Sequence, residues 1–433
     1  PREIVHYMCQ ESLANYLATE LEGKASKEDI ETLIKYGETV VEHDSRVASE
    51  GRETERYSFK LPRSVRKHAK LIDEKLASIR VCDPAVGSGA FPVGMMNEII
   101  RTRNALTPYI GKDGERTPYH FKREAIQNCL YGVDIDPGAV EIAKLRLWLS
   151  LVVDEEERDN IQPLPNLDYK IVQGNSLLSV EKNLFNAALF SKLEELKPLY
   201  FNETSASKKQ EYRNQIDELI SQITNGHKDF DFEVYFSEVF HEKKGFDVVI
   251  ANPPYLSSKN IDENLKPIYE KSFYSPTAHY DIYIIFIERA LQLLRRGNCL
   301  CFITSNKYFS QKYGSKIREI LLKNQILRIV NFNFKIFEAT VDTAITIVRN
   351  SESKSGHKVK VLDLHEADLG NKDRLSLENI LFDKSRYQII EQKFFEELPD
   401  SNFRLDVHKE DFDLRNKIHG NTLPLEEVCF VIY

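Results

Sequence analysis

The chain has 433 residues, which is long enough for two domains or for one large domain with additions. Its composition is ordinary for a globular protein, with 42% hydrophobic and 29% charged residues, and no apolar run approaches the ~18 residues of a membrane span. The formal net charge of −8 opposes nucleic-acid binding over the whole surface, because phosphate contacts need lysine and arginine. Any basic surface is therefore expected to be local, or to lie beyond residue 433.

The ends of the chain and its cysteines add two expectations. No signal peptide opens the sequence, which starts at Pro1 and stops inside the apolar run Val431-Ile432-Tyr433, so we expect a fragment, or the ordered part, of a longer cytoplasmic protein. The six cysteines have no CxxC spacing and are interpreted as small core residues in a reducing compartment. Without an HExxH motif or a Cys/His cluster, no metal site is predicted.

The N-terminal region is predicted to be helical on both sides of a polar loop. An amphipathic helix is expected over residues 4–21, whose apolar side chains fall on or near one face: Ile4, Val5, Met8, Leu13, Leu17 and Leu21. Residues 36–60 are polar and are predicted to be a loop. A basic helical pattern then runs from residue 61 to residue 78.

Strands and helices alternate from residue 79 onward. Strands are predicted at 79–84, 130–135, 169–173, 246–251, 299–304, 326–332 and 343–349. Helices are predicted at 91–103, at 137–152 with Asp136 as N-cap, and at 280–295. A charged helical insert interrupts the pattern at about 181–240, and the alternation is lost from about Ser351. The fold class is therefore α/β, with a mostly parallel, Rossmann-like sheet and an antiparallel strand pair at one edge.

A glycine-rich turn follows the first strand. The residues expected to form a cofactor site there are Asp83, Pro84, Ala85, Gly87, Ser88, Gly89 and Phe91. Glycines let backbone approach a ligand closely, and the turn exposes N–H groups at a helix start. The pattern is neither GxGxxG nor a P-loop, and a ligand-free tight turn stays an alternative. The Asp83 carboxylate suits a cationic ligand group, which favours S-adenosylmethionine with its ammonium and sulfonium.

The next two strands end in further candidate cofactor contacts. Asp134 is expected to accept hydrogen bonds from ribose hydroxyls. Ile135 is expected either to pack on the adenine face or to be a core residue. In the segment Asn175-Ser176, the asparagine side chain is expected to bond the adenine amino group, with an ordinary turn asparagine as the alternative.

The tetrapeptide Asn252-Pro253-Pro254-Tyr255 directly follows the apolar strand 246–251. The Asn252 side-chain oxygen and the Pro253 carbonyl can accept hydrogen bonds from an exocyclic amino group and turn its lone pair toward a methyl donor. Proline stiffens the backbone, so these acceptors are pre-placed, and Tyr255 supplies a stacking face. Because a base cannot react inside a duplex, it must be flipped out, and Phe337 is a candidate second wall, with a plain core role equally open.

These motifs resemble those of the γ-class N6-adenine DNA methyltransferases, a family whose members place a cofactor half before a catalytic half and a target recognition domain last. The matching segments are DPAVGSGAFP, YGVDIDP, GNSL and NPPY, with further similarity at 1–8, 281–286, 303–309 and 337–348. The helical insert and size look most like the methylase part of single-chain type IIG restriction–modification or related phage-defence enzymes. Asn175 stands where aspartate is common in the family, so the chain departs from the family pattern at the predicted adenine contact.

The resemblance implies a class I S-adenosylmethionine-dependent methyltransferase that modifies double-stranded DNA. It implies a catalytic domain at 1–350, and a connector with the start of a C-terminal target recognition region at 351–433. A nuclease domain or subunit would lie outside this chain, because no convincing nuclease motif is present.

Three other interpretations stay open. Protein-glutamine methyltransferases also use NPPY, but they are shorter, and an RNA methyltransferase is a further alternative. Asn252 rather than serine in the first position argues against a cytosine-N4 enzyme. An inactive DNA-binding subunit that retains the fold would be expected to have lost the tetrapeptide.

Overall fold

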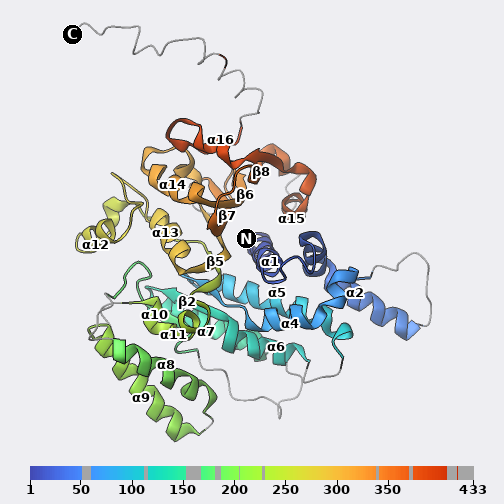
Figure 1. Cartoon of the computed structure of the whole chain (residues 1–433), viewed down its shortest axis with the longest axis vertical. Helices are drawn as coiled ribbons and strands as arrows, with labels where there is room; N and C mark the ends of the chain where they lie inside the picture. Colours follow the sequence, from blue (N-terminus) through green and yellow to red (C-terminus); the bar gives the residue numbers. More distant parts are fainter. Residues whose placement is uncertain are drawn as a thin grey trace.

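The computed structural model describes residues 1–50, 60–111, 116–152, 167–180, 187–203, 205–226, 230–337, 341–369, 374–406 and 417. Its centre is one mixed sheet with the strand order β3-β2-β1-β4-β5-β7-β6-β8-β9. Helices cover both faces of this sheet, and an additional helical hairpin lies at the periphery (Figure 1). Among the described residues, no helix is both long and apolar enough to cross a bilayer.

The N-terminal half of the sheet is parallel and follows the predicted strands closely. It contains β1 (Val81–Asp83), β2 (Leu130–Asp134), β3 (Ile171–Gln173) and β4 (Phe246–Ala251). All six residues of β4 are buried, as expected for a continuous apolar strand that is covered on both faces. Val248 and Ile250 belong to the core beside α5, whereas Val249 and Ala251 belong to the core beside α13.

The C-terminal half contains the predicted antiparallel strands and extends beyond them. Here β5 (Leu294–Ser305) and β6 (Asn324–Phe332) both pair antiparallel with β7 (Thr343–Glu352). The expectation that alternation ends near Ser351 is wrong, because β8 (Lys358–Leu364) pairs with β6 and β9 (Gln388–Glu391) pairs with β8. The antiparallel strand β7 therefore lies inside the sheet, and β9 forms its edge.

The helical layer beside α5 (Ala90–Leu106) includes α1 (Arg2–Glu20), α2 (Lys27–Glu50), α4 (Ala69–Ser78) and α7 (Pro137–Val152). The predicted loop at 36–60 is wrong over 36–50, where α2 continues; residues 51–59 lie outside the described part. Gly37 explains the difference, since a Cβ there would come within 2.6 Å of Ala105. The glycine is a close helix contact with α5 rather than a turn.

The opposite layer contains α11 (Ser237–Lys243), α13 (Tyr283–Leu293), α14 (Ser315–Lys323) and α16 (Gln392–Glu396). The predicted helix at 280–295 is shorter than expected at both ends. Leu294 already pairs with Phe246 in the sheet, and Gly297, which has a φ of +85°, lies within β5.

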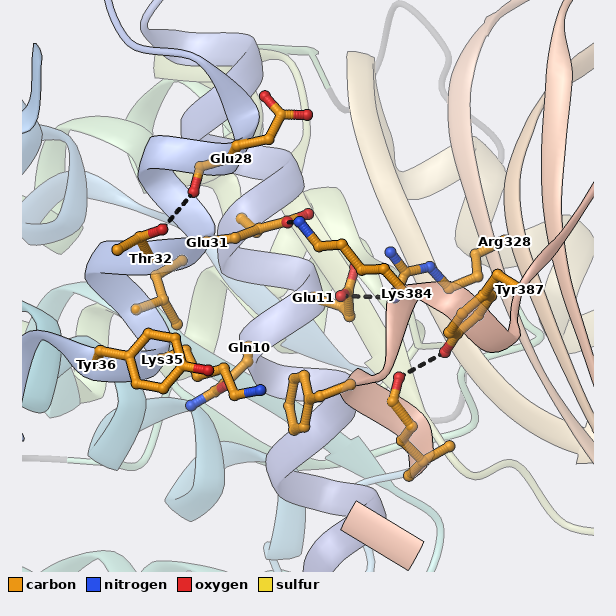
Figure 2. Close-up of a pocket in the computed structure, with 14 residues that line it drawn as sticks. Gln10, Glu11, Glu28, Glu31, Thr32, Lys35, Tyr36, Arg328, Lys384 and Tyr387 are labelled. Carbon is orange, nitrogen blue, oxygen red and sulfur yellow. Dashed lines mark hydrogen bonds and ion pairs between the residues drawn. The ribbon is translucent and has the colours of Figure 1, made fainter. Parts of the chain in front are cut away.

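The C-terminal segment returns to the N-terminal helices at a cavity of about 290 Å³. The cavity lies between α1, α2, β6 and the turn after α15 (Arg374–Phe382), as Figure 2 shows. Arg328 forms a 2.6 Å ion pair with Glu11, and Lys384 forms one of 2.5 Å with Glu31. Because these cations and carboxylates neutralise each other, we interpret the contact as a junction that holds the C-terminal segment on the N-terminal helices.

The predicted insert is confirmed as a helical hairpin of α8 (Ala187–Asn202) and α9 (Ala206–Ile223) with a small core of its own. Two buried lysines and one largely buried glutamate attach it to the sheet. Lys170 donates to Glu238 at 3.0 Å, and Lys197 on α8 lies 3.5 Å from the other oxygen of the same carboxylate. Burial by itself would raise the pKa of Glu238, but the two ammonium groups outweigh it and hold that pKa at about 2.

Replacing this carboxylate is predicted to destabilise the fold. Glu238→Gln removes the negative charge that both buried ammonium groups contact, so the free energy of unfolding in urea is expected to fall by about 3–5 kcal/mol. The matched control is Glu242→Gln on the same helix, because Glu242 makes only an exposed 3.5 Å pair with Arg80 and is expected to change stability by less than ~1 kcal/mol. Equal losses in the free energy of unfolding from the two substitutions would contradict the role of Glu238 as a counter-charge to the two lysines.

Candidate active site

The glycine turn joins β1 to α5 and uses its two glycines differently. Gly89 is the N-cap of α5 with a φ of +80°, and a Cβ there would lie 3.0 Å from Ala143 on α7. Gly87 also has a positive φ, +50°, but a Cβ there would meet no atom within 4 Å. Gly89 therefore allows close helix packing, whereas Gly87 leaves the outer side of the turn open to a ligand.

Asp134 at the end of β2 fixes this turn. One carboxylate oxygen accepts a hydrogen bond from the backbone N–H of Gly87 at 2.8 Å, and the other accepts one from Asp136 N at 3.0 Å. The side chain of Asp136 in turn accepts from Gly138 N at 2.8 Å, which confirms its predicted role as the cap of α7. Asp134 thus has a structural role that the sequence did not reveal, and each of its oxygens retains a lone pair for ribose hydroxyls.

Asp83 is a buried carboxylate, and the described part of the chain shows no ion pair to it. It is 2% exposed and accepts one hydrogen bond from Ala85 N at 3.0 Å. Burial raises the pKa of Asp83 to about 8, and the neighbouring negative charge of Asp134 acts in the same direction. A cationic group beside Asp83 would favour the ionised form, as expected for a ligand that carries an ammonium.

The ends of β2 and β3 complete this part of the site. Ile135 is 65% exposed, so the alternative that it is a core residue is wrong, and its side chain offers apolar surface next to Asp134. Ser176 donates to the carbonyl of Pro84 at 2.6 Å and joins the third strand end to the turn. Asn175 donates to the Tyr269 hydroxyl at 2.7 Å and accepts from Leu177 N at 3.1 Å, so its amide already has protein partners on both sides.

The tetrapeptide follows β4 on the same edge of the sheet. Asn252 and Pro254 are exposed, Pro253 is buried and Tyr255 is half-buried. The Tyr255 hydroxyl donates to Asn252 Oδ1 at 2.8 Å. The segment after it is held by two backbone bonds, Ser258 N to Tyr280 O at 2.7 Å and Ile282 N to Leu256 O at 2.8 Å.

The pairing of β1 with β4 brings the turn and the tetrapeptide together. The two strands are adjacent and parallel, with Val81 opposite Val248 and Cys82 opposite Val249. Their carboxyl ends therefore share one edge, although about 170 residues separate Asp83 from Asn252 in the sequence. All predicted cofactor residues and the tetrapeptide follow strand ends along this edge.

The strand pairing does not bring the predicted site residue Phe337 next to the tetrapeptide. It is half-buried and packs against the core beside α5, whereas Tyr255 packs against the core beside α13. Its role as a second wall for a base stays a prediction. Sequence reasoning also missed Tyr283, whose ring meets that of Tyr255 edge-on at 6.2 Å, and Tyr269, which binds Asn175.

Known proteins match much of this chain. Residues 128–337 match the family described as Eco57I restriction-modification methylase. A putative type II restriction enzyme and methyltransferase of Methanocaldococcus jannaschii is 27% identical over 369 residues, covering 65% of this chain and 31% of that protein. The type II restriction enzyme and methyltransferase RM.Eco57I of Escherichia coli is 24% identical over 298 residues, covering 65% of this chain and 25% of that protein.

The adenine-specific methyltransferase PglX of Streptomyces coelicolor is 24% identical over 256 residues, covering 56% of this chain and 18% of that protein. The chain thus spans about a third or less of the length of these relatives. The matched family region contains Asp134 and Asn252–Tyr255 and begins after the glycine turn. The match to the Eco57I restriction-modification methylase family thus covers residues 128–337, a little under half of the chain.

Proposed function

We propose that the chain is the methyltransferase part of a site-specific, adenine-specific DNA methyltransferase in a restriction–modification or phage-defence system. It would transfer a methyl group from S-adenosylmethionine to the N6 amino group of an adenine flipped out of double-stranded DNA. The observation that carries this proposal is the Asn252–Tyr255 tetrapeptide, with Asn252 exposed, on the same sheet edge as the Asp83 to Gly89 turn. The names of the relatives, which describe restriction enzymes with methyltransferase activity and an adenine-specific methyltransferase, support it.

The donor set around the turn fits S-adenosylmethionine. Asp83 would pair with the ammonium group, Asp134 would bind the ribose hydroxyls, and Ile135 would cover one face of the adenine. The open side of Gly87 would admit the cofactor to the backbone of the turn. When bound, the cofactor supplies a methyl group that its sulfonium has already activated for displacement.

The tetrapeptide would prepare the nucleophile. The adenine amino group is a weak nucleophile, because its lone pair is delocalised into the ring. Asn252 Oδ1 and the Pro253 carbonyl would accept its two hydrogens from outside the ring plane and so localise the lone pair. Tyr255 would hold the ring by stacking, which contributes about 1–3 kcal/mol per base. The amino nitrogen would lose its proton after the new N–C bond has formed.

The domain roles follow from this proposal. Residues 1–350 would form the catalytic domain, and residues 351–433 would connect it to a target recognition region, with β8 and β9 as the part of the connector that joins the catalytic sheet. The proposal is tested by sequencing methylated bases in DNA from cells that express the protein. Methylation of an RNA or of a protein glutamine, or cofactor binding without any methylation, would favour the other interpretations.

Asn252→Ala is predicted to separate catalysis from cofactor binding. Loss of one acceptor that acts on the reacting amino group is expected to slow single-turnover methylation by about 10²–10³. The dissociation constant for S-adenosylmethionine, measured by calorimetry, should stay within about twofold. Asn214→Ala on the exposed face of α9 is the matched control and should keep the wild-type rate; a comparable loss in both variants would contradict the prediction.

Tyr255 is predicted to act through its ring rather than through its hydroxyl. Tyr255→Phe keeps the stacking face and removes one hydrogen bond, so the methylation rate should stay within about tenfold of wild type. Tyr255→Ala removes the face and should lose about 10–100-fold. If the phenylalanine variant were as slow as the alanine variant, the hydroxyl and not the ring would be the important group.

Cofactor affinity is predicted to rise with pH between about 6 and 7.5. Asp83, whose pKa is raised to about 8, is mostly protonated there and must release its proton to pair with the ammonium. The α-amino group of the cofactor, with an ordinary pKa near ~8, stays protonated over most of this range. Calorimetry in buffers of different ionisation enthalpy should detect the released proton. Asp83→Asn should bind more weakly and lose this pH dependence; an unchanged pH profile would be evidence against the role of Asp83.

A further inference from the structure

The ring of Tyr255 rests against a second tyrosine. Tyr283, the first residue of α13, is fully buried, and its ring lies 6.2 Å from that of Tyr255 at an interplanar angle of 85°. This edge-to-face geometry is favourable for two aromatic rings. Since Tyr255 itself is only half-buried, the orientation of Tyr283 limits where the Tyr255 ring can lie.

Tyr283 is held by a directed chain of hydrogen bonds. The Tyr313 hydroxyl donates to Asp281 Oδ2 at 3.0 Å and lies 2.8 Å from the Tyr283 hydroxyl. A phenol has only one hydrogen, so Tyr283 must be the donor to Tyr313. The chain therefore runs from Tyr283 to Tyr313 and ends on a carboxylate, whose negative charge strengthens the last bond.

The residue that bears this carboxylate is connected through its backbone to the segment just after the tetrapeptide. Asp281 forms an isolated antiparallel bridge with Ser257, two residues after Tyr255. The bonds from Ser258 N to Tyr280 O and from Ile282 N to Leu256 O hold the same two segments together. Tyr255 is thus connected to Asp281 in two ways. One is the backbone pairing of the following residues, and the other is the chain of tyrosine side chains.

We propose that Asp281 and Tyr313 are positioning residues that act through Tyr283 to fix the ring plane of Tyr255. This inference rests on the proposed function, because the ring plane matters only if a target base stacks on it. Asn252 Oδ1 accepts the Tyr255 hydroxyl at 2.8 Å, and it is the same oxygen that an adenine amino group would use. When the base also donates to this oxygen, the oxygen is shared between two donors, and the edge-to-face contact with Tyr283 is a second constraint on the ring.

The experiment compares single-turnover methylation by wild type, Tyr283→Phe, Tyr313→Phe and the double variant, all in the full chain with its DNA substrate. Each single substitution keeps the ring and breaks the chain, so the rate should fall about threefold to tenfold while the S-adenosylmethionine dissociation constant stays within about twofold. Because the hydroxyls act in series, the double variant should be no slower than the slower single variant.

A second set of variants tests whether the chain acts through Tyr255. In a Tyr255→Ala background, Tyr283→Phe should cause no further loss, because the ring that it positions is gone. The matched control is Tyr169→Phe, which removes a buried hydroxyl that donates to Asp217 at 2.7 Å in the helical insert and should keep the wild-type rate. Asp281→Asn, which keeps an acceptor oxygen without the charge, should lose about twofold to fivefold and provides a milder test if a tyrosine variant does not fold.

The outcomes distinguish the two proposals. The positioning role alone would be overturned if the wild type is active and the single variants methylate at the wild-type rate. It would also be overturned if Tyr283→Phe causes a further loss in the Tyr255→Ala background. Wild type that binds S-adenosylmethionine but leaves DNA unmodified would overturn the proposed function, and the positioning role would fall with it.

Discussion

The parallel pairing of β1 with β4 is the constraint on which the site depends. Each strand is short and buried, and each ends in a polar segment that would be unremarkable alone. Pairing in parallel brings both carboxyl ends to one edge, so the Asp83 turn and the Asn252 tetrapeptide become neighbours. Ser176 and Asp134 then tie the second and third strand ends to the same turn through backbone atoms. The site is thus assembled by the order of strands in the sheet.

Much of this arrangement could be predicted because its signals are local. The bounds of the strand 246–251 were predicted to the residue. Its six residues, five of them apolar and one an aspartate, are typical of a buried strand, and a rigid proline turn follows them. The antiparallel β6–β7 pairing and the helical insert also followed from length and patterning. The glycine turn and the tetrapeptide were recognisable because their chemistry resides in consecutive residues.

The parts that the sequence did not reveal depend on contacts between distant segments. Gly37 was predicted to lie in a loop, but it lies in α2 and packs closely on Ala105 of α5. Its role therefore depends on a residue that is distant in the sequence. In β8, Val359 and Val361 alternate with lysines in a two-residue period that indicates a strand, yet only pairing with β6 makes it part of the sheet. The Tyr283–Tyr313–Asp281 chain joins residues about 30 positions apart, so no local sequence motif predicts it.

Under the proposed function, the hydrogen bond between Tyr255 and Asn252 affects which amines can react. One of the two lone pairs of the amide oxygen already accepts a hydroxyl from its own loop, so an incoming amine has a single lone pair left and competes with water for it. A flat heterocycle gains stacking energy on the adjacent ring and can meet that competition, whereas ammonia or a lysine side chain gains none. The four residues of the tetrapeptide would then select against other cellular amines, independently of how the target DNA sequence is recognised.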